Sequence, residues 1–197
     1  MTYMIGEPRI DAEKRYYMAC LDLEGRSCLV VGAGPVGIEK ARGLLECGAD
    51  VTVVAPEAVP EIANLGARWL QRPYESSDLD GRFLVIAASS DTELNRRVFA
   101  GAEARGLLCN VADVPELCSF ILPAVYRQDP IAIAVSTGGA SPALAQRIRS
   151  EVAALIGPEY AELARTLRDL RPWGKKRFQT YEERRDYFQQ LVARELG

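Results

Sequence analysis

The sequence predicts an α/β protein with a helix-covered parallel sheet first, then a small strand-helix segment and a helical end. Through residue 111, short apolar runs alternate with amphipathic stretches of helical length, which is typical of parallel strands joined by helices. A glycine-rich turn, Gly32–Gly37, joins the first apolar run to the first such stretch. Beyond about residue 114 the alternation stops. We therefore expect a Rossmann-like domain over residues 1–114, a small strand-helix segment over 115–156 and a helical domain over 157–197.

Five apolar runs predict the strands of the first domain. They are Ser27–Val31, Val51–Ala55, Ala67–Leu70, Phe83–Ala88 and Leu107–Val111. The predicted helices cover Val36–Cys47, ended by Gly48, and a stretch from a cap at Ser90 or Asp91 to about Arg105. Pro56 and Pro60 should stop the second strand, because proline cannot donate to a sheet ladder. Ligands of such a sheet bind beyond the carboxyl ends of its strands.

The later part predicts a hairpin and three helices. The hairpin strands are Ser119–Ile121 and Ile131–Ser136, with a turn over Tyr126–Pro130. Ser141-Pro142 starts a helix that runs toward Ile156, since a capping residue is followed by proline at the first helical position. The remaining elements are a helix over Glu159–Leu170, a connector over Pro172–Lys176 and a last helix begun by the capping box Thr180 to Glu183.

Composition excludes several classes of partner. The 197 residues carry a formal net charge of −3, so no overall charge favours nucleic acid, and no reader motif is present. No apolar run approaches the ~20 residues that span a bilayer, and the charged residues within Met1–Cys20 exclude an apolar leader. We therefore expect a cytoplasmic protein with neither a nucleic-acid nor a membrane partner.

Cysteine and histidine usage restricts the chemistry further. The five cysteines are scattered and form no C-x-x-C pair, which indicates free thiols in a reducing compartment. The sequence has no histidine, so catalytic triads that use it and most zinc sites are excluded. We predict no metal site. A carboxylate, cysteine, tyrosine or lysine must move any proton.

The turn Gly32-Ala33-Gly34-Pro35-Val36-Gly37 fits the G-x-G-x-x-G fingerprint in its required setting, between a buried strand and a helix. Gly32 allows the tight turn, Gly34 lets the backbone approach a pyrophosphate, and Gly37 lets the helix pack close to the strand. The free N–H groups and the positive dipole end of that helix would hold the phosphates. The alternative is a turn whose glycines serve packing alone.

The nucleotide preference depends on the end of the second strand. The acidic residue that binds the ribose hydroxyls is absent from its usual place at the end of this strand, and Glu57 lies slightly farther along the chain. Glu57 is either that ribose ligand or a solvated loop residue. No arginine or lysine stands beside it to receive a 2′-phosphate, which favours NAD over NADP.

Two further segments carry candidate chemistry. Asp113 ends the run Asn110-Val111-Ala112-Asp113, at the sheet edge where a substrate would meet a nicotinamide. It is either the group that takes a proton during an oxidation or a turn-forming aspartate before Val114-Pro115. Ser136-Thr137-Gly138-Gly139 offers hydroxyls and backbone N–H groups before a helix, as an anion-binding turn or as a plain loop.

Taken together, these segments resemble a known family. The glycine turn with Val51–Pro56, the Asn-Val-x-Asp run, Ser119–Pro123 and the block Ser136–Ala145 are similar to precorrin-2 dehydrogenase, the N-terminal module of siroheme synthases. The resemblance covers essentially the whole chain, including Lys175–Phe178. The block Ser136–Ala145 is far more specific than the glycine turn. The family fold implies a Rossmann domain, a dimerisation segment and a helical domain.

The resemblance implies NAD-dependent oxidation of precorrin-2 to sirohydrochlorin by a homodimer. It leaves open whether the same site inserts ferrous iron as a co-substrate. The family's acid maps onto Asp113, and its cofactor contacts map onto Pro35, Val36, Pro56 and Glu57. The substrate is rich in carboxylates, so cationic side chains should line its pocket. The predicted substrate contacts are Ser136, Thr137, Gly138, Arg147 and Lys176, with Arg149, Lys175 and Arg177 as further candidates.

A regulatory NAD-binding module without catalysis is the competing interpretation. Such a module would share the glycine turn but would have no need for Asp113 or the block Ser136–Ala145. NADH formation that depends on substrate separates the two. A dehydrogenase of a small metabolite is disfavoured, because no large substrate domain follows the first one.

Overall fold

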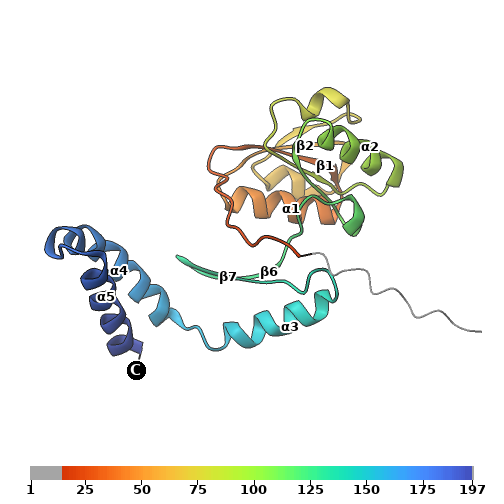
Figure 1. Ribbon diagram of the computed structural model, residues 1–197. Helices are drawn as coiled ribbons and strands as arrows, with labels where there is room; N and C mark the ends of the chain where they lie inside the picture. The colour runs from red at the N-terminus through yellow and green to blue at the C-terminus, as the bar shows by residue number, and fades with distance from the viewer. Residues whose placement is uncertain (1–14, 197) are drawn as a thin grey trace, which may run out of the picture. The chain divides into compact units, whose positions relative to one another are not determined.

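The computed structural model describes residues 15–196, which fall into two compact units, one through Ile121 and one from Leu122 (Figure 1). The charged residues within Met1–Cys20 led us to expect no apolar leader. Residues 1–14 of this segment lie outside the described residues. Within the described range, none of the helices combines the length and the apolar character that crossing a bilayer requires.

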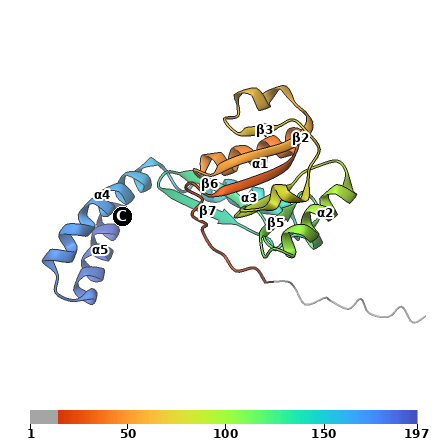
Figure 2. The same cartoon turned by 90° about the horizontal axis from the view of Figure 1, so that it is seen from above.

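A five-stranded parallel sheet forms the centre of the first unit. Its strands are β1 (Ser27–Ala33), β2 (Asp50–Ala58), β3 (Arg68–Leu70), β4 (Leu84–Ala87) and β5 (Leu108–Val111). Their order is β3-β2-β1-β4-β5, so β3 and β5 form opposite edges (Figure 2). The order reverses between β1 and β4, which is the switch point of a doubly wound sheet. The predicted Rossmann-like fold is confirmed.

Two helices cover the two faces of this sheet (Figure 1). Successive side chains of a strand point to opposite faces, so Val30 packs on the side of α1 (Pro35–Glu46) and Val31 on the side of α2 (Thr92–Glu103). Each fully buried valine or leucine of this kind contributes about 1.5–3 kcal/mol to folding. The connections contain the short 3₁₀ helices η1 (Pro60–Asn64), η2 (Ser76–Leu79) and η3 (Pro115–Leu117).

The second strand is longer than predicted, because Pro56 does not stop it. Val31 pairs with Val54, but Ala33 pairs with Ala58, so β2 carries a bulge opposite the glycine turn. Pro56 lies within this bulge, where its missing N–H removes no bond from the ladder. Glu57 consequently belongs to the end of a strand and not to a loop.

The second unit is a hairpin followed by three helices. Its strands are β6 (Ala124–Gln128) and β7 (Ile131–Val135), and its helices are α3 (Pro142–Ala153), α4 (Pro158–Arg177) and α5 (Tyr181–Leu196). Ser141 caps α3, since its side chain accepts from the Leu144 N–H, as predicted. The predicted capping box before α5 is also present, with Thr180 and Glu183 bonding each other's backbone N–H groups.

The first hairpin strand was predicted in the wrong place. Ser119–Ile121 is irregular, because Ser119 donates its N–H to the Cys109 carbonyl at 2.8 Å and its Oγ accepts from the Cys109 N–H at 2.8 Å. These bonds tie the segment to β5. The strand begins only at Ala124, and the turn of the hairpin is Asp129-Pro130.

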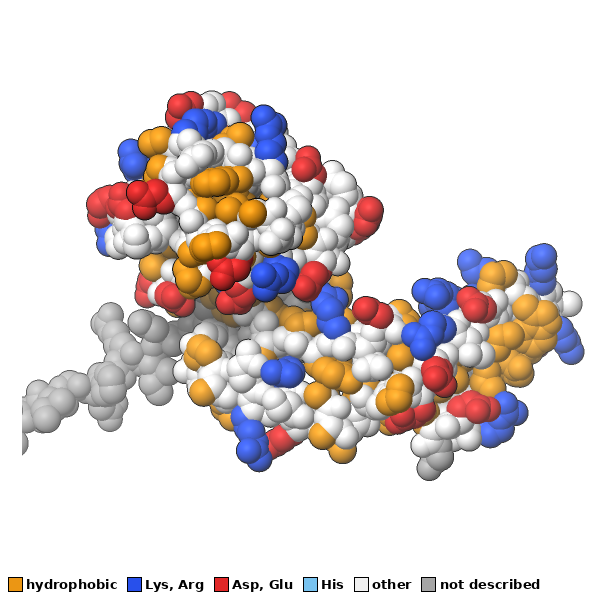
Figure 3. Space-filling view, turned by 180° about the vertical axis from the view of Figure 1, so that it is seen from behind, with side chains coloured by type: hydrophobic (Ala, Val, Ile, Leu, Met, Phe, Trp, Pro, Cys, Tyr) orange, Lys and Arg blue, Asp and Glu red, His pale blue; other side chains and the backbone are white. Residues whose placement is uncertain are grey.

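The predicted connector Pro172–Lys176 is wrong as well, because α4 continues through Pro172 to Arg177. Aromatic packing accounts for the difference: the ring of Trp173 lies 5.8 Å from that of Phe178 and 5.5 Å from that of Tyr187 on α5. These contacts offset the hydrogen bond that proline removes. Figure 3 shows hydrophobic side chains gathered at this end of α4 and α5.

An ion pair fastens the connection between β3 and β4. Arg72 contacts both carboxylate oxygens of Asp78, at 2.6 and 2.9 Å, and the Asp78 carboxylate also accepts from the Glu75 N–H at 2.9 Å. The Asp78 side chain is 5 % exposed. The hydrogen bond from Arg72 lowers the pKa of the Asp78 carboxyl group from its ordinary value, although burial opposes this.

Asp78→Asn should lower the free energy of unfolding at pH 7 by about 1–3 kcal/mol, because it leaves the Arg72 charge without its partner. A lowered pKa in the folded state means that the Asp78 contribution is complete above the unfolded value of about 3.9. It is lost as the pH falls through the folded pKa. Urea unfolding of both proteins should therefore show a difference at pH 7 that shrinks below about pH 4.

Asp80→Asn is the matched control for this experiment. Asp80 pairs with Arg105 at 3.1 Å, but its side chain is 65 % exposed. An exposed pair contributes about 0–1 kcal/mol, so this variant should remain close to the wild type at either pH. Equal losses in the two variants would contradict the assigned role of the Asp78 ion pair.

Candidate dinucleotide site

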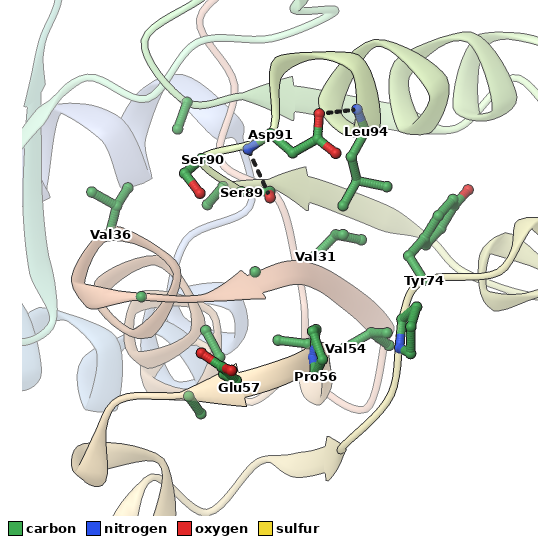
Figure 4. A pocket seen from close by; sticks show the side chains of 18 of the residues that line it. Val31, Val36, Val54, Pro56, Glu57, Tyr74, Ser89, Ser90, Asp91 and Leu94 are labelled. Carbon is green, nitrogen blue, oxygen red and sulfur yellow. Dashed lines mark hydrogen bonds between the residues drawn. The ribbon is translucent and has the colours of Figure 1, made fainter.

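A pocket of about 840 Å³ opens at the carboxyl ends of the strands in the first unit (Figure 4). All five strands or the segments that follow them contribute to its lining. The lining includes Gly32–Val36 from the β1 turn, Ala55–Val59 from the end of β2, Pro73–Tyr74 after β3, Ala88–Asp91 after β4 and Ala112–Asp113 after β5. This is where the general rule for parallel sheets places a ligand.

Close packing of the backbone requires glycine at two positions of the turn. Gly32 has φ of +106°, and a Cβ there would lie 2.5 Å from the Ala88 carbonyl oxygen. A Cβ on Gly37 would overlap the Gly32 carbonyl group. The two positions therefore bring β1, β4 and α1 closer together than any side chain allows.

Gly34 is different, because nothing in the protein demands a glycine there. Its φ of −75° suits any residue, and a Cβ built on it would have no neighbour within 4 Å. Gly34 is also the N-cap of α1, and no side chain caps this helix end. The open space lies beside a positive helix terminus with free N–H groups, so it fits the pyrophosphate of a dinucleotide.

The predicted cofactor residues lie together. The pocket is lined by Gly32, Gly34, Pro35, Val36, Pro56 and Glu57, whereas Gly37 lies beneath the turn. The exposed Glu57 side chain stands at the end of β2, beside the β1 turn (Figure 4). A carboxylate in this place can accept hydrogen bonds from ribose hydroxyls.

Asp113 is exposed and lines the same pocket beyond β5. Its φ of +61° is left-handed, a conformation that aspartate tolerates better than most residues. The backbone around it is fixed: the Ala112 N–H donates to Ala87, and the buried Asn110 amide donates to the Phe120 carbonyl at 3.0 Å. Asp113 is thus a turn residue that also faces the pocket, so the two interpretations of it are compatible.

The buried thiols are less suitable than the Asp113 carboxylate as groups that could take a proton. Burial raises the pKa of Cys28 to about 11 and that of Cys109 to about 12. Neither side chain forms a thiolate near neutral pH, and neither lines the pocket.

Several pocket residues were missed from the sequence. Ligands bind beyond the carboxyl ends of parallel strands, and this rule applied to β4 would have identified Ser89, Ser90 and Asp91. The sequence analysis inferred only a helix cap at this place. The buried Asn95 side chain holds this segment by accepting from the Ser89 N–H and donating to the Ser89 carbonyl. Tyr74 and Arg97 carry no recognisable sequence signal, because folding alone brings their elements to the pocket.

The predicted substrate residues all lie in the second unit. Thr137 Oγ1 accepts from the Ser141 N–H at 3.0 Å, and Ser136 Oγ accepts from the Gly138 N–H at 3.1 Å, so these hydroxyls shape their own turn. Arg147 forms an ion pair with Glu151 on α3. Lys176 lies in the last turn of α4, about 27 Å along that helix from its start. Because α4 leads away from α3, Lys176 is not part of the cluster at the start of α3 (Figure 1).

The first unit has the sheet order, glycine turn and strand-end pocket of a dinucleotide-binding domain. The chain belongs to the family described as "Putative NAD(P)-binding", whose model matches residues 19–124. The predicted dinucleotide cofactor is thereby confirmed. Residues 128–155 match a second family model, "Sirohaem biosynthesis protein central".

Individual relatives agree with the predicted resemblance. The chain is 40 % identical to the siroheme synthase of Methylobacillus flagellatus and 42 % identical to that of Thioalkalivibrio sulfidiphilus, over 90 % of its own length. It spans only 39 % and 37 % of these relatives. A solved structure, "SirC, precorrin-2 dehydrogenase", is 27 % identical with a TM-score of 0.73, over 90 % of this chain and 89 % of that one.

Gly37→Ala should destabilise the first unit by about 1–3 kcal/mol, because the added Cβ forces α1 away from the Gly32 carbonyl group. Gly43→Ala in the same helix is the matched control. Gly43 is exposed and a Cβ there meets nothing, so alanine should stabilise the helix by about 0.8–1 kcal/mol. Thermal unfolding of both variants should show shifts of opposite sign, and a shared sign would refute the packing argument.

Gly34→Asp should leave the fold intact and weaken NAD binding at least about tenfold. The side chain enters open space, but it places a negative charge where the pyrophosphate binds. Calorimetric titration with NAD measures the loss, and the thermal midpoint without ligand serves as the control. Unchanged NAD affinity in a folded variant would show that the phosphates bind elsewhere.

Proposed function

We propose that the chain is an NAD-dependent dehydrogenase that oxidises precorrin-2 to sirohydrochlorin. The observation that carries this proposal is the similarity to SirC, precorrin-2 dehydrogenase, which extends over nearly the whole of both chains. The similarity to siroheme synthases over 90 % of this chain points to the same chemistry. The pocket supports it, since a phosphate cradle and a carboxylate line the same cavity.

Asp113 is the proposed proton acceptor. Bound NAD supplies the acceptor for the hydride that the oxidation removes. The substrate also loses a proton, and we assign this proton to a carboxylate oxygen of Asp113. The fixed turn around Asp113 supports the assignment, because a base works best when its position is set before the substrate arrives.

NAD is preferred over NADP because Glu57 lies at the end of β2. A carboxylate there accepts hydrogen bonds from the ribose hydroxyls and repels a 2′-phosphate. The substrate contacts proposed for the carboxylates of precorrin-2 remain Ser136, Thr137, Gly138, Arg147 and Lys176. The turn Ser136–Gly138 and the cationic Arg147 lie at and near the start of α3, which supports an anion-binding role for these four residues.

We also propose a homodimer in the cytoplasm, with residues 115–156 as the dimerisation segment and 1–114 and 157–197 as flanking domains. A two-stranded sheet such as β6–β7 is only marginally stable alone, and the segment exposes Leu122, Val125 and Leu144 by 41–51 %. Light scattering on the purified protein should give twice the mass of the chain. A monomer would contradict the dimer and leave the pocket argument unaffected.

Ferrous iron as a co-substrate is a further proposal, which follows from the resemblance. Absorbance spectra of the reaction before and after addition of ferrous iron test it directly. A new spectrum that requires both the protein and the metal supports insertion.

Asp113→Asn should lower the rate of precorrin-2-dependent NADH formation by about 10²–10⁴-fold, the typical contribution of a general base. Asparagine tolerates the left-handed backbone, so NAD affinity should stay within about twofold of the wild type. Glu116→Gln, an exposed carboxylate in η3, is the control and should keep full activity. NADH formation at the wild-type rate in Asp113→Asn would remove this residue from the mechanism.

The competing function, a regulatory NAD-binding module, predicts a different result. Such a protein would bind NAD with no NADH produced on addition of precorrin-2. The wild-type assay alone decides between the two.

A further inference from the structure

The end of α4 and the start of α5 form an exposed surface outside the strand-end pocket. We call residues 173–184, which join the two helices, the α4–α5 tip. Trp173 is 44 % exposed and Tyr181 is 64 % exposed, although both rings are large and mostly apolar. Figure 3 shows hydrophobic side chains at this end of the helices, with lysine and arginine side chains around them. Exposed rings with a charged rim are typical of a binding surface.

The aromatic rings of the tip are held in place by one another. The Phe178 ring lies 5.1 Å from that of Tyr187, and the Trp173 ring lies 5.8 Å from that of Phe178 and nearly perpendicular to it. Gly174 lets α5 approach closely, because a Cβ there would lie 2.9 Å from a ring carbon of Phe188. The exposed part of Trp173 is therefore a preformed surface on which a planar ring can stack.

The tip also carries cations that lack acidic partners. Among residues 15–196, no carboxylate forms an ion pair with four of its side chains: Lys175, Lys176, Arg177 and Arg184. Two of the three acids beside them are already engaged. Asp186 pairs with Arg185 at 2.6 Å, and Glu183 accepts from the Thr180 N–H in the capping box. The tip thus has an excess of positive charge in a chain whose formal net charge is −3.

Helix dipoles account for only part of this charge. Lys175, Lys176 and Arg177 lie in the last turn of α4, where the negative end of the dipole favours cations. Arg184 is the fourth residue of α5, near the positive end of that dipole, where a cation is disfavoured. It is only partly exposed, and its Cδ lies 3.7 Å from where a Cβ on Gly174 would be. An anionic ligand at the tip would explain why an arginine is placed there.

Two arginines of the tip are stacked on its rings. The Arg177 guanidinium lies 5.8 Å from the centre of the Phe178 ring, and that of Arg184 lies 5.8 Å from the centre of the Tyr181 ring. An arginine stacked in this way keeps its N–H groups free, and these can bind a carboxylate through two parallel hydrogen bonds. The tip therefore places a stacking surface beside several carboxylate-binding groups.

We propose that the α4–α5 tip binds a planar ring with carboxylates on its rim, as a second site besides the one at the start of α3. Lys176, which lies apart from the residues at the start of α3, belongs to this second site. The inference rests on the proposed function for the natural ligand, since a carboxylate-rich tetrapyrrole is such a ring. A single-stranded nucleic acid fits less well, because it requires a cationic groove that follows several nucleotides.

The test is a titration of the full chain with uroporphyrin, a stable porphyrin with a carboxylate-rich rim. The chain has two tryptophans, so Trp69→Phe leaves Trp173 as the only one. A porphyrin stacked on Trp173 should quench the fluorescence of this variant in a saturable way. The Soret absorbance of the porphyrin, titrated with the unaltered chain, gives the affinity independently if Trp69→Phe does not fold.

Arg177→Gln and Arg184→Gln should each weaken uroporphyrin binding about tenfold, because each removes a charge-assisted hydrogen bond. Added salt should weaken it as well. Arg194→Gln is the matched control on α5. Arg194 is 73 % exposed and pairs with Glu195, so this variant should bind within about twofold of the unaltered chain. Arg147→Gln, at the other site, should leave the quenching of Trp173 unchanged.

Four outcomes overturn the assignment. The first is unchanged affinity in folded Arg177→Gln and Arg184→Gln. The second is an equal loss in Arg194→Gln, since this would show an effect of net charge alone. The third is quenching that Arg147→Gln removes and the tip variants keep, which would place the porphyrin at the start of α3. The fourth is displacement of uroporphyrin by a lower concentration of single-stranded oligothymidylate, which would make nucleic acid the better ligand.

The result is separable from the proposed function. If uroporphyrin binds as expected but precorrin-2 yields no NADH, the tip keeps its assignment and the dehydrogenase activity is refuted. If precorrin-2 yields NADH but the tip variants bind uroporphyrin as the unaltered chain does, the activity stands and the second site is refuted.

Discussion

The site depends on how closely α1 approaches the first and fourth strands. Gly37 lies against the Gly32 carbonyl, and Gly32 lies against the Ala88 carbonyl, at separations that no side chain permits. This three-part contact fixes the start of α1 relative to β1 and β4, so the helix terminus points into the pocket. The absence of a side chain at Gly34 then leaves the phosphate space open. Packing thus dictates two of the glycines, and ligand access explains the third.

A second constraint operates at the other end of the pocket, where Asp113 follows β5. The buried Asn110 amide bonds the Phe120 carbonyl, and Cys118 Sγ lies 3.3 Å from the backbone N and O atoms of Val111. These bonds close the loop that carries Asp113. Asn110 and Cys118 therefore act as positioning residues for a carboxylate that itself makes no contribution to the core.

Local signals explain most of what the sequence predicted correctly. The strand and helix order of the first unit, the caps at Ser141 and Thr180 and the glycine turn all follow from nearby residues. The errors at Pro56, Ser119–Ile121 and Pro172 have one cause in common. In each case a partner distant in the chain decided the structure: the bulge opposite β1, the bonds to Cys109, and the aromatic packing on α5.

The residues of the site can be divided in the same way, into those that local signals predict and those that distant parts of the chain position. Residues of the glycine turn, Glu57 and Asp113 could be found because they lie at or just beyond the carboxyl ends of strands, and these ends meet at one edge of a parallel sheet. Tyr74 and Arg97 could not, since Tyr74 reaches the pocket through the path of the β3–β4 connection and Arg97 through the packing of α2 on the sheet.

The connection between β3 and β4 shows how stability and ligand access are balanced. A full helix there would bury more apolar surface over β1 and β2, but it would also fill the space beside α2. The protein has the short η2 instead, fastened by the ion pair of Arg72 and Asp78 and by the backbone bond from Glu75. Polar bonds within the segment replace helix packing as the source of its rigidity. They hold the connection so that the Tyr74 hydroxyl lies against α2, near Gly101, while Pro73 and Tyr74 line the pocket.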